Sequence, residues 1–307
     1  MKHAYVFPGQ GAQAVGMGKD LYDAVPRARE LFERANEILG FRITDIMFAG
    51  TDEELKQTRV TQPAVFLHSV VLAEALGVRP DATAGHSLGE FSALVVAGAL
   101  SFEDGLRLVA KRAAAMQQAC EAQPGAMAAI LGLEDGAVEQ TCDAIDGVVV
   151  AANYNCPGQL VIGGDQAAVD KAAALAAQAG ARRCLPLKVS GPFHTALMQP
   201  AGDALREKFK TVSFAPMQCP VLFNCLGREK DAADSIPSLL EKQVHSAVRW
   251  EDTVRRLADL GVDTAIEIGP GKALTGFVKK TVGSAIACYP VETAAQLQQL
   301  IRTLQGA

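Results

Sequence analysis

The chain has 307 residues, of which 49% are hydrophobic and 21% are charged, so it can bury a substantial core and is not a disordered polymer. Its formal net charge of −5 gives no overall basic field, which argues against non-specific nucleic-acid binding. No apolar run approaches a membrane span, and Pro8 and Gly9 end the first apolar stretch too early for a signal peptide. We therefore expect a cytoplasmic protein that binds neither nucleic acid nor membrane.

Strand and helix patterns alternate along the first part of the chain. We expect a strand at 4–7, followed by the glycine-rich loop PGQGAQ, and an apolar helix at 60–76. A short strand at 82–84 runs directly into the sequence GHSLGE and a helix at 88–97. This alternation predicts an α/β class with a mainly parallel sheet.

The next helix begins at Ser101, where Asp104 completes a capping box. Its apolar residues recur every three or four positions as far as Cys120. Arg112 lies on the flank of this apolar stripe, so we expect it to reach across the interior edge of the domain. The alternative is that Arg112 snorkels from the helix edge into solvent.

The pattern changes after residue 125. Strand-like and helical segments then follow in the order β-α-β-β-α-β, at 127–131, 135–145, 148–152, 160–162, 166–179 and 183–187, with Asp165 as the N-cap of the second helix. That order is typical of a ferredoxin-like unit. The α/β pattern resumes afterwards, with strands at 221–224, 264–268 and 286–289.

These patterns predict two domains. We expect a large, discontinuous α/β-hydrolase-like catalytic domain at 1–124 and 189–307, and a small ferredoxin-like domain inserted at 125–188. A cleft between two such domains is the natural place for a substrate.

The seven cysteines are an odd number, without a C-x-x-C pair, and make a poor disulfide or zinc framework. We expect reduced, mostly buried thiols and no metal site. None lies in a glycine-rich turn, which disfavours a cysteine nucleophile.

Residues Gly85 to Gly89 match G-x-S-x-G between a strand and a helix. A nucleophile elbow needs a strained turn with little side-chain bulk, which lifts the serine hydroxyl above the sheet. The helix after Ser87 also directs its N-terminus at any oxyanion formed there. The pentapeptide alone is weak evidence, since Ser87 could be an ordinary N-cap, but the strand–turn–helix context favours a nucleophile.

A serine nucleophile needs a base, and the chain has five histidines. His86 neighbours Ser87 on a sharp turn, so its side chain should point elsewhere. His3 lies in a strand, and His68 lies in an apolar helix, where a core role is the better interpretation. Position in the sequence leaves His194, in the loop SGPFH, as a modest favourite over His245.

Taken in order, the motifs resemble those of malonyl-CoA:acyl carrier protein transacylases over nearly the whole chain. The motifs are FPGQGAQ at 7–13, TQPA at 61–64, GHSLGE at 85–90, Arg112, YNCPGQLVI at 154–162, FH at 193–194, QVHSAVRW at 243–250 and GPGK at 269–272. One such motif would be weak evidence, but the ordered set is highly specific. The chain departs from the family at Ala247, where proline is frequent, and in the form of the SGP segment before Phe193.

The resemblance implies a role for individual residues. Ser87 would be the acylated nucleophile and His194 its general base and acid. The backbone N–H groups of Gln10 and Leu88 would form the oxyanion hole. Arg112 would bind the free carboxylate of the malonyl group, a task suited to a bidentate guanidinium.

Three further residues are implied around this pocket. Gln243 would orient His194 through an amide carbonyl, giving a dyad rather than a Ser-His-Asp triad, and Gln62 would line the pocket. Phe193, directly before the histidine, accompanies malonyl rather than methylmalonyl preference in related polyketide acyltransferases.

The implied function is transfer of malonyl from malonyl-CoA to the phosphopantetheine thiol of acyl carrier protein, for fatty acid biosynthesis. No metal or cofactor is expected beyond these two substrates, and we expect a monomer. The alternatives are a stand-alone polyketide acyltransferase, a malonate-decarboxylase subunit, an esterase or thioesterase with the same elbow, and a non-catalytic malonyl-holding subunit. Arg112 disfavours the hydrolases of neutral esters, which have no use for a buried arginine beside the serine.

Overall fold

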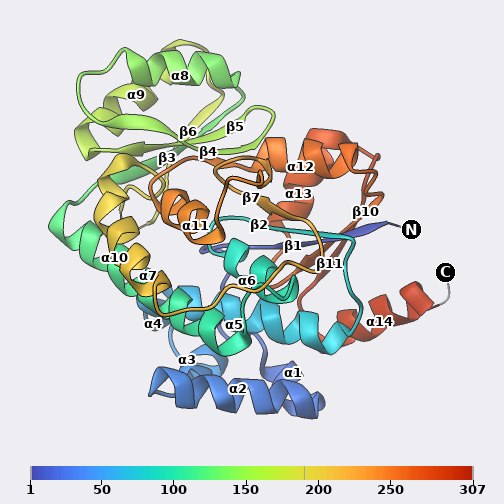
Figure 1. The fold of residues 1–307 in the computed structure, drawn as a ribbon. Coiled ribbons are helices and arrows are strands. Elements are labelled where there is room, and N and C mark those ends of the chain that lie inside the picture. The colour runs from blue at the N-terminus through green and yellow to red at the C-terminus, as the bar shows by residue number, and fades with distance from the viewer. Residues whose placement is uncertain (1, 190, 306–307) are drawn as a thin grey trace. The chain divides into compact units, whose positions relative to one another are not determined.

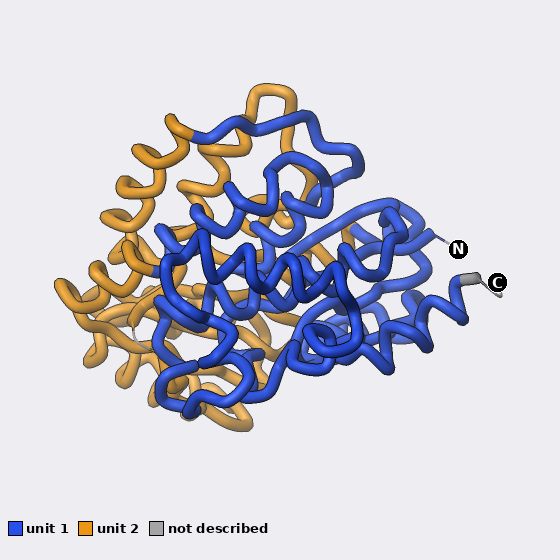
Figure 2. Tube along the Cα trace, turned by 90° about the horizontal axis from the view of Figure 1, so that it is seen from below, with its two compact units in different colours: residues 1–113, 212–222, 257–307 blue, residues 114–211, 223–256 orange. Residues whose placement is uncertain are grey.

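The computed structural model describes residues 2–189 and 191–305. Helices and strands alternate to give a mixed α/β fold (Figure 1). The chain divides into two compact units, coloured separately in Figure 2: unit 1 comprises residues 1–113, 212–222 and 257–307, and unit 2 comprises residues 114–211 and 223–256. Ser190, within the SGPF segment, lies outside the described residues.

Unit 1 is built on a parallel sheet with strand order β11-β10-β1-β2-β7. Its strands are β1 (His3–Phe7), β2 (Ala82–Gly85), β7 (Val221–Phe223), β10 (Thr264–Ile268) and β11 (Ala287–Val291). β2 and β10 are buried along their whole length. Such buried strands are expected where helices cover both faces of a parallel sheet.

The helices of unit 1 lie on both faces of this sheet, with α5 and α14 below it and α13 above it in Figure 1. They are α1 (Lys19–Ala24), α2 (Pro26–Leu39), α3 (Ile43–Ala49), α4 (Asp52–Lys56), α5 (Thr58–Leu76), α6 (Gly89–Val96), α13 (Ala273–Val282) and α14 (Ala294–Gln305). Helix α7 (Phe102–Ala122) begins in unit 1 and continues into unit 2. As predicted, the Ser101 hydroxyl caps its first turn, accepting from the Asp104 N–H at 3.0 Å.

Unit 2 contains a second sheet with strand order β6-β3-β5-β4-β9. Its pairs are antiparallel except for β4 with β9. The strands are β3 (Ala126–Leu131), β4 (Val149–Cys156), β5 (Gln159–Gly164), β6 (Arg183–Pro186) and β9 (Val248–Arg249).

Two helices, α8 (Asp135–Asp143) and α9 (Gln166–Gln178), cover one face of the second sheet (Figure 1). Their apolar residues close a core with those of the strands, including Ile130, Val138 and Ile162. Asp165 is the N-cap of α9 as predicted, but its side chain does not cap the helix. Its carboxylate instead accepts from the Val148 N–H at 3.2 Å and so joins two parts of the unit.

The predicted β-α-β-β-α-β succession over 125–188 is present as β3, α8, β4, β5, α9 and β6. Unit 2 extends beyond it and also contains the 3₁₀ turn η1 (Ala196–Met198), α10 (Gln199–Phe209), β8 (Arg228–Glu229), α11 (Ile236–Val244) and most of α12 (Trp250–Asp259). The predicted domain boundaries, 1–124 with 189–307 and 125–188, stay a prediction.

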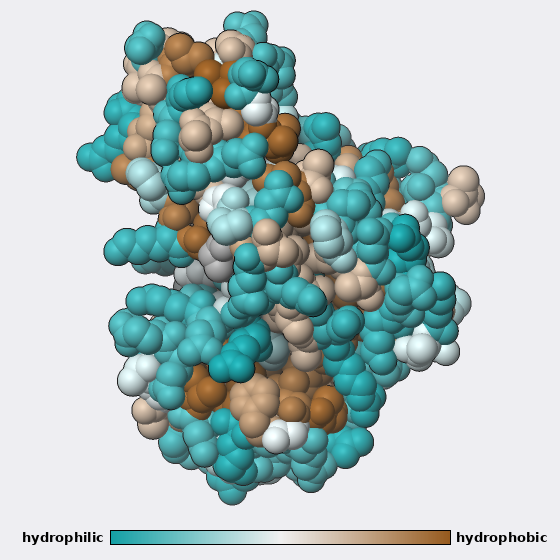
Figure 3. Space-filling model, turned by 90° about the vertical axis from the view of Figure 1, so that its left-hand side faces the viewer, coloured by the Kyte–Doolittle hydropathy of each residue, from teal (hydrophilic) through white to brown (hydrophobic). Residues whose placement is uncertain are grey.

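The surface seen in Figure 3 is mainly hydrophilic, with hydrophobic residues in separate patches. Among residues 2–189 and 191–305, no helix is both long and apolar enough to cross a membrane.

Candidate active site

Ser87 occupies the tight turn between β2 and α6. Its φ of 52° lies in the left-handed region, which non-glycine residues seldom adopt. A Cβ on Gly85 would lie 1.8 Å from the Gly89 carbonyl carbon, and one on Gly89 would lie 2.1 Å from the Phe7 carbonyl oxygen. Both glycines of the G-x-S-x-G motif are therefore required by backbone contacts, which is the condition for a nucleophile elbow.

The turn ends in the first turn of α6. The Leu88 backbone is already helical, and the Glu90 N–H donates to the Ser87 carbonyl at 3.1 Å. Ser87 therefore precedes the positive end of a helix dipole, which favours negative charge developing beside it.

The loop after β1 packs directly on the elbow. A Cβ on Gly9 would lie 2.6 Å from the His86 carbonyl oxygen, and one on Gly269 would lie 2.6 Å from the Pro8 ring. The GPGK segment therefore also packs closely against this loop. Gln10 follows immediately, so its main-chain N–H belongs to a loop fixed against the Ser87 turn.

A chain of side-chain hydrogen bonds joins the predicted residues of unit 1. Arg112 donates from Nη2 to Ser87 Oγ at 3.1 Å and from Nη1 to Gln62 Oε1 at 2.8 Å. Gln62 in turn donates to Gln10 Oε1 at 3.3 Å, and Gln10 donates to Thr58 Oγ1 at 3.3 Å. Ser87 Oγ is the acceptor in its bond with the guanidinium, so that bond does not use the hydroxyl proton of Ser87.

Arg112 is only 1% exposed, so the snorkelling interpretation is wrong. Burial lowers the pKa of its guanidinium to about 10, and the Glu90 carboxylate opposes that shift. The side chain is therefore still charged near neutral pH. Its guanidinium carbon also lies 5.8 Å from the centre of the Phe91 ring. A fixed, desolvated cation beside a serine hydroxyl is well suited to hold an anionic group of a substrate.

His194 lies in unit 2 and is 4% exposed. Its φ is 61°, and among the described residues only Ser87 shares a positive φ without being glycine. Its Nδ1 lies 2.9 Å from the Gln243 main-chain oxygen and 3.2 Å from the Ser246 main-chain oxygen. Since both carbonyls can only accept, Nδ1 carries the proton, and the neutral ring keeps a lone pair on Nε2 for use as a base.

Three of the other four histidines have different surroundings. His3 Nδ1 lies 3.5 Å from an Asp81 carboxylate oxygen, and His68 is fully buried in α5. The ring of His86 is 6.4 Å from that of Phe277. None of these contacts resembles the paired carbonyls that fix the tautomer of His194.

The thiols whose pKa is clearly shifted are poor candidates for a nucleophile. No disulfide joins the cysteines of the described residues, and burial raises the pKa of both Cys142 and Cys219 to about 11. A protonated, buried thiol is a poor nucleophile.

The contact of Gln243 with His194 was expected from the resemblance, whereas that of Ser246 was missed. Gln243 contacts His194 through its main chain, with its side chain buried, and the Ser246 carbonyl is an additional acceptor. The motif QVHSAVRW contains both residues, but main-chain contacts carry no side-chain signature. Phe193 is buried beside His194 in the chain.

The acyl transferase domain family matches residues 4–306. This chain belongs to that family. It is 44% identical over 310 residues to the malonyl CoA-acyl carrier protein transacylase of Bacillus subtilis (strain 168), covering 99% of this chain and 98% of the relative.

Solved structures agree with this assignment. An acyl carrier protein S-malonyltransferase from Vibrio cholerae superposes with a TM-score of 0.93 at 42% identity, over 98% of this chain and 100% of that one. A malonyl-transacylase in complex with its type II PKS acyl-carrier protein gives a TM-score of 0.94 at 38% identity, over 99% of this chain and 100% of that one. The chain is therefore an acyltransferase of the transacylase type.

Proposed function

We propose that this protein transfers a malonyl group from malonyl-CoA to the phosphopantetheine thiol of an acyl carrier protein, through a malonyl ester on Ser87. The observation that carries the proposal is the buried Arg112 guanidinium, 3.1 Å from Ser87 Oγ. An acyl group that ends in a carboxylate needs such a cation, whereas a neutral acyl group does not. The relatives named above carry the same activity in their names.

The first half-reaction forms the acyl-enzyme. His194 Nε2 takes the proton of Ser87 while Oγ attacks the thioester carbonyl, and the backbone N–H groups of Gln10 and Leu88 hold the oxyanion. The C–S bond then breaks, and the coenzyme A sulfur leaves with the proton carried by His194. The positive end of α6 and the fixed loop after β1 support this placement of the oxyanion.

The second half-reaction reverses these steps with a new thiol. The carrier protein's phosphopantetheine thiol gives its proton to His194 and attacks the malonyl ester, and Ser87 Oγ recovers the proton as it leaves. All protons and electron pairs are supplied by the two substrates and the dyad, so we propose that the reaction uses no metal and no further cofactor.

Acyl selectivity would rest on two side chains. Arg112 pairs with the malonyl carboxylate, and Gln62 holds the guanidinium by accepting at 2.8 Å. Phe193 would fill the space that a methyl branch on the malonyl group requires. Both roles follow from the resemblance and from the burial of these side chains.

We propose that the carrier protein docks on an exposed basic and apolar patch of β6. Arg183 and Leu185 alternate with Cys184, whose side chain packs on the helical core, so they share the opposite face of the sheet. Leu185 is 42% exposed and Leu187, which follows the strand, is 37% exposed, while Lys188 adds a second cation. Carrier proteins of this pathway are typically acidic, so such a patch would offer both charge complementarity and apolar contact. Arg182, Lys279 and Lys280 are further exposed candidates.

At the level of the fold, we propose an α/β-hydrolase-like catalytic domain and a ferredoxin-like inserted domain. The parallel order of unit 1 and the elbow at the end of β2 support the first description. The order β6-β3-β5-β4 with antiparallel pairing supports the second.

Fatty acid synthesis is the pathway we propose, with polyketide synthesis as the second candidate. The observation behind the second candidate is the structural relative solved with a type II PKS acyl-carrier protein. The two differ in the carrier protein used, not in the chemistry at Ser87.

Incubation with a panel of acyl-CoAs, followed by mass spectrometry of the intact protein, tests the proposal. Malonyl-CoA should add one malonyl mass to wild type and none to Ser87→Ala, while the exposed-serine control Ser284→Ala should label normally. Label that persists in Ser87→Ala, or that maps to a cysteine, contradicts the assignment. Rapid release of free malonate without a carrier protein would indicate a hydrolase instead.

A further inference from the structure

The segment that carries His194, residues 191–195, is termed here the histidine loop. Because His194 has a φ of 61°, an ordinary backbone conformation is locally more favourable, and other contacts must hold the loop. The carbonyls of Gln243 and Ser246 fix the imidazole but not the backbone that bears it.

Thr195 makes the contact that closes this loop. Its side chain is 1% exposed, and its hydroxyl donates to the Pro192 carbonyl at 2.7 Å, spanning His194. The same oxygen accepts from the Leu197 N–H at 3.3 Å and caps the turn η1. One hydroxyl therefore joins the residues before and after the strained position.

A second contact holds the start of the loop against α7. A Cβ on Gly191 would lie 2.1 Å from Cys120 Sγ, so the sulfur packs directly on the glycine Cα. A Cβ on Gly125 would similarly lie 2.6 Å from the Pro192 ring.

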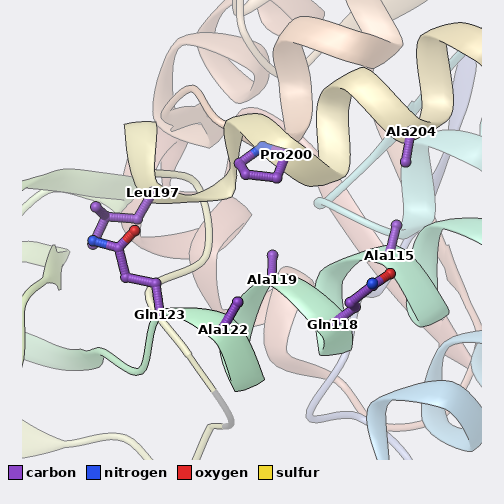
Figure 4. A pocket seen from close by; sticks show the side chains of 8 residues that line it. All are labelled: Ala115, Gln118, Ala119, Ala122, Gln123, Leu197, Pro200 and Ala204. Atoms are coloured by element: carbon purple, nitrogen blue, oxygen red, sulfur yellow. The ribbon is translucent and has the colours of Figure 1, made fainter.

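Packing on the far side of η1 is looser. A pocket of about 340 Å³ separates α7 from η1 and α10, and Figure 4 shows Ala115 and Ala119 of α7 facing Pro200 and Ala204 across it. Leu197 lies at the edge of the same pocket. Because close packing does not confine the chain there, the conformation of the histidine loop depends more strongly on the hydrogen bonds of Thr195.

We propose that Thr195 is a positioning residue for His194: its hydroxyl holds the histidine loop in the strained conformation that presents Nε2 as a base. This inference rests on the proposed role of His194. Without the hydroxyl, the loop can relax toward an ordinary φ and turn the ring away from its two carbonyl acceptors. Both half-reactions should then slow, while binding of malonyl-CoA should not change.

The test compares Thr195→Val, Thr195→Ser and the matched control Thr141→Val in the full chain. Thr141 is also buried in unit 2 and also donates to a carbonyl three residues earlier, at 2.7 Å. Thr195→Val should lower kcat for malonyl transfer by roughly tenfold to a hundredfold with KM for malonyl-CoA unchanged. Thr195→Ser should keep most of the activity, and Thr141→Val should stay within about twofold of wild type.

Active-site titration separates positioning from folding. A positioning effect leaves one malonyl group per chain and slows its formation, whereas partial unfolding lowers the labelled fraction without changing the rate of the remainder.

¹⁵N NMR of histidine-labelled protein gives a readout without substrate. His194 should show a single Nδ1-protonated tautomer in wild type and a mixture in Thr195→Val.

The contact with Cys120 supplies an independent variant. Gly191→Ala should slow transfer because its methyl group would lie 2.1 Å from Cys120 Sγ and 2.9 Å from Cys120 Cβ, and Gly191→Ala with Cys120→Gly should recover part of the rate because both atoms are gone. Failure of this rescue would overturn the role of the Gly191 contact.

Wild-type rates in Thr195→Val, equal losses in Thr195→Ser and Thr195→Val, or an equal loss in Thr141→Val would overturn the role of Thr195. If wild type takes no malonyl group, the proposed function fails. The tautomer measurement still decides whether Thr195 positions the ring.

Discussion

Ser87 and His194 share an unusual backbone conformation, but the molecule holds them there in different ways. Ser87 is fixed by glycines two residues away on each side and by the backbone of β1. His194 is fixed by main-chain carbonyls 49 and 52 residues further along the chain and by neighbouring side chains. The first arrangement depends on backbone contacts of two glycines, one within the motif and one with β1, and leaves no room for a side chain on either glycine. The second is assembled from hydrogen bonds with distant segments and can be weakened by degrees.

Among the variants that test this comparison, Gly89→Ala should have the largest effect. The added methyl group would lie 2.1 Å from the Phe7 carbonyl oxygen, so the elbow must shift and Ser87 must move with it. We expect malonyl labelling to fall by roughly 10⁴-fold or more, and stability to fall by about 3 kcal/mol. The control is Gly276→Ala in α13, where nothing lies within 4 Å of the added Cβ and labelling should be normal. Normal labelling of Gly89→Ala would show that the elbow is not held by its glycines.

The next variant, Arg112→Ala, tests whether the hydrogen-bonded side chains beside Ser87 bind the substrate. Leaving a malonyl carboxylate unpaired in a dry pocket costs on the order of 2–5 kcal/mol, so malonyl kcat/KM should fall roughly thirtyfold to several thousandfold. Acetyl transfer should change little, because acetyl-CoA has no carboxylate to lose. Arg112→Lys should rescue only partly, since lysine lacks the planar fork. Equal slowing of both substrates would assign Arg112 to the fold rather than to specificity.

Acid should distinguish unit 1, which carries Ser87, from unit 2, which carries His194. Helix α5 carries Gln62 and also His68, whose pKa is lowered by burial to about 4, with Asp20 opposing the shift. As pH falls, His68 therefore takes up a proton in the unfolded chain before it does so in the folded chain. The stability contributed by neutral His68 is intact above about pH 6.5 and is lost as pH falls toward 4. We expect a loss of about 2 kcal/mol between pH 7 and pH 5 in urea unfolding.

In hydrogen exchange, peptides of α5 should lose protection before those of the β3–β5 sheet. His68→Leu should flatten the pH dependence of unfolding. An unchanged slope in that variant would show that another group controls acid stability.

The smallest effect concerns docking of the carrier protein. Arg183→Glu should raise KM for the carrier protein about two- to fivefold at low salt, with KM for malonyl-CoA unchanged, because exposed charge pairs are weak and screened. Added salt should abolish the difference. Lys171→Glu, on the exposed side of α9, is the matched control. Equal salt sensitivity of both KM values would remove β6 as the docking surface.

Much of this protein follows from short stretches of sequence. The predicted strands and helices agree with the structure to within a few residues, although α1, α2, α3 and α4 have no counterpart among them. The elbow could be predicted because the G-x-S-x-G motif occupies five consecutive residues between a strand and a helix. The ordered motifs also indicated the family. What these features share is that a few consecutive residues are enough to recognise each of them.

Only the tertiary structure decided the rest. A helix flank left Arg112 free to point inward or outward, and it is the packing of α7 with α5 and α6 that buries the guanidinium beside Ser87. His194 and His245 could not be separated by spacing, because the carbonyls that select the tautomer of His194 belong to a distant segment and leave no side-chain signature. Thr195 likewise acquires its role only where its hydroxyl meets the Pro192 carbonyl across a strained turn. Burial and backbone hydrogen bonding depend on which segments of the chain contact each other. Short sequence patterns do not show these contacts, because they form only when the whole chain has folded.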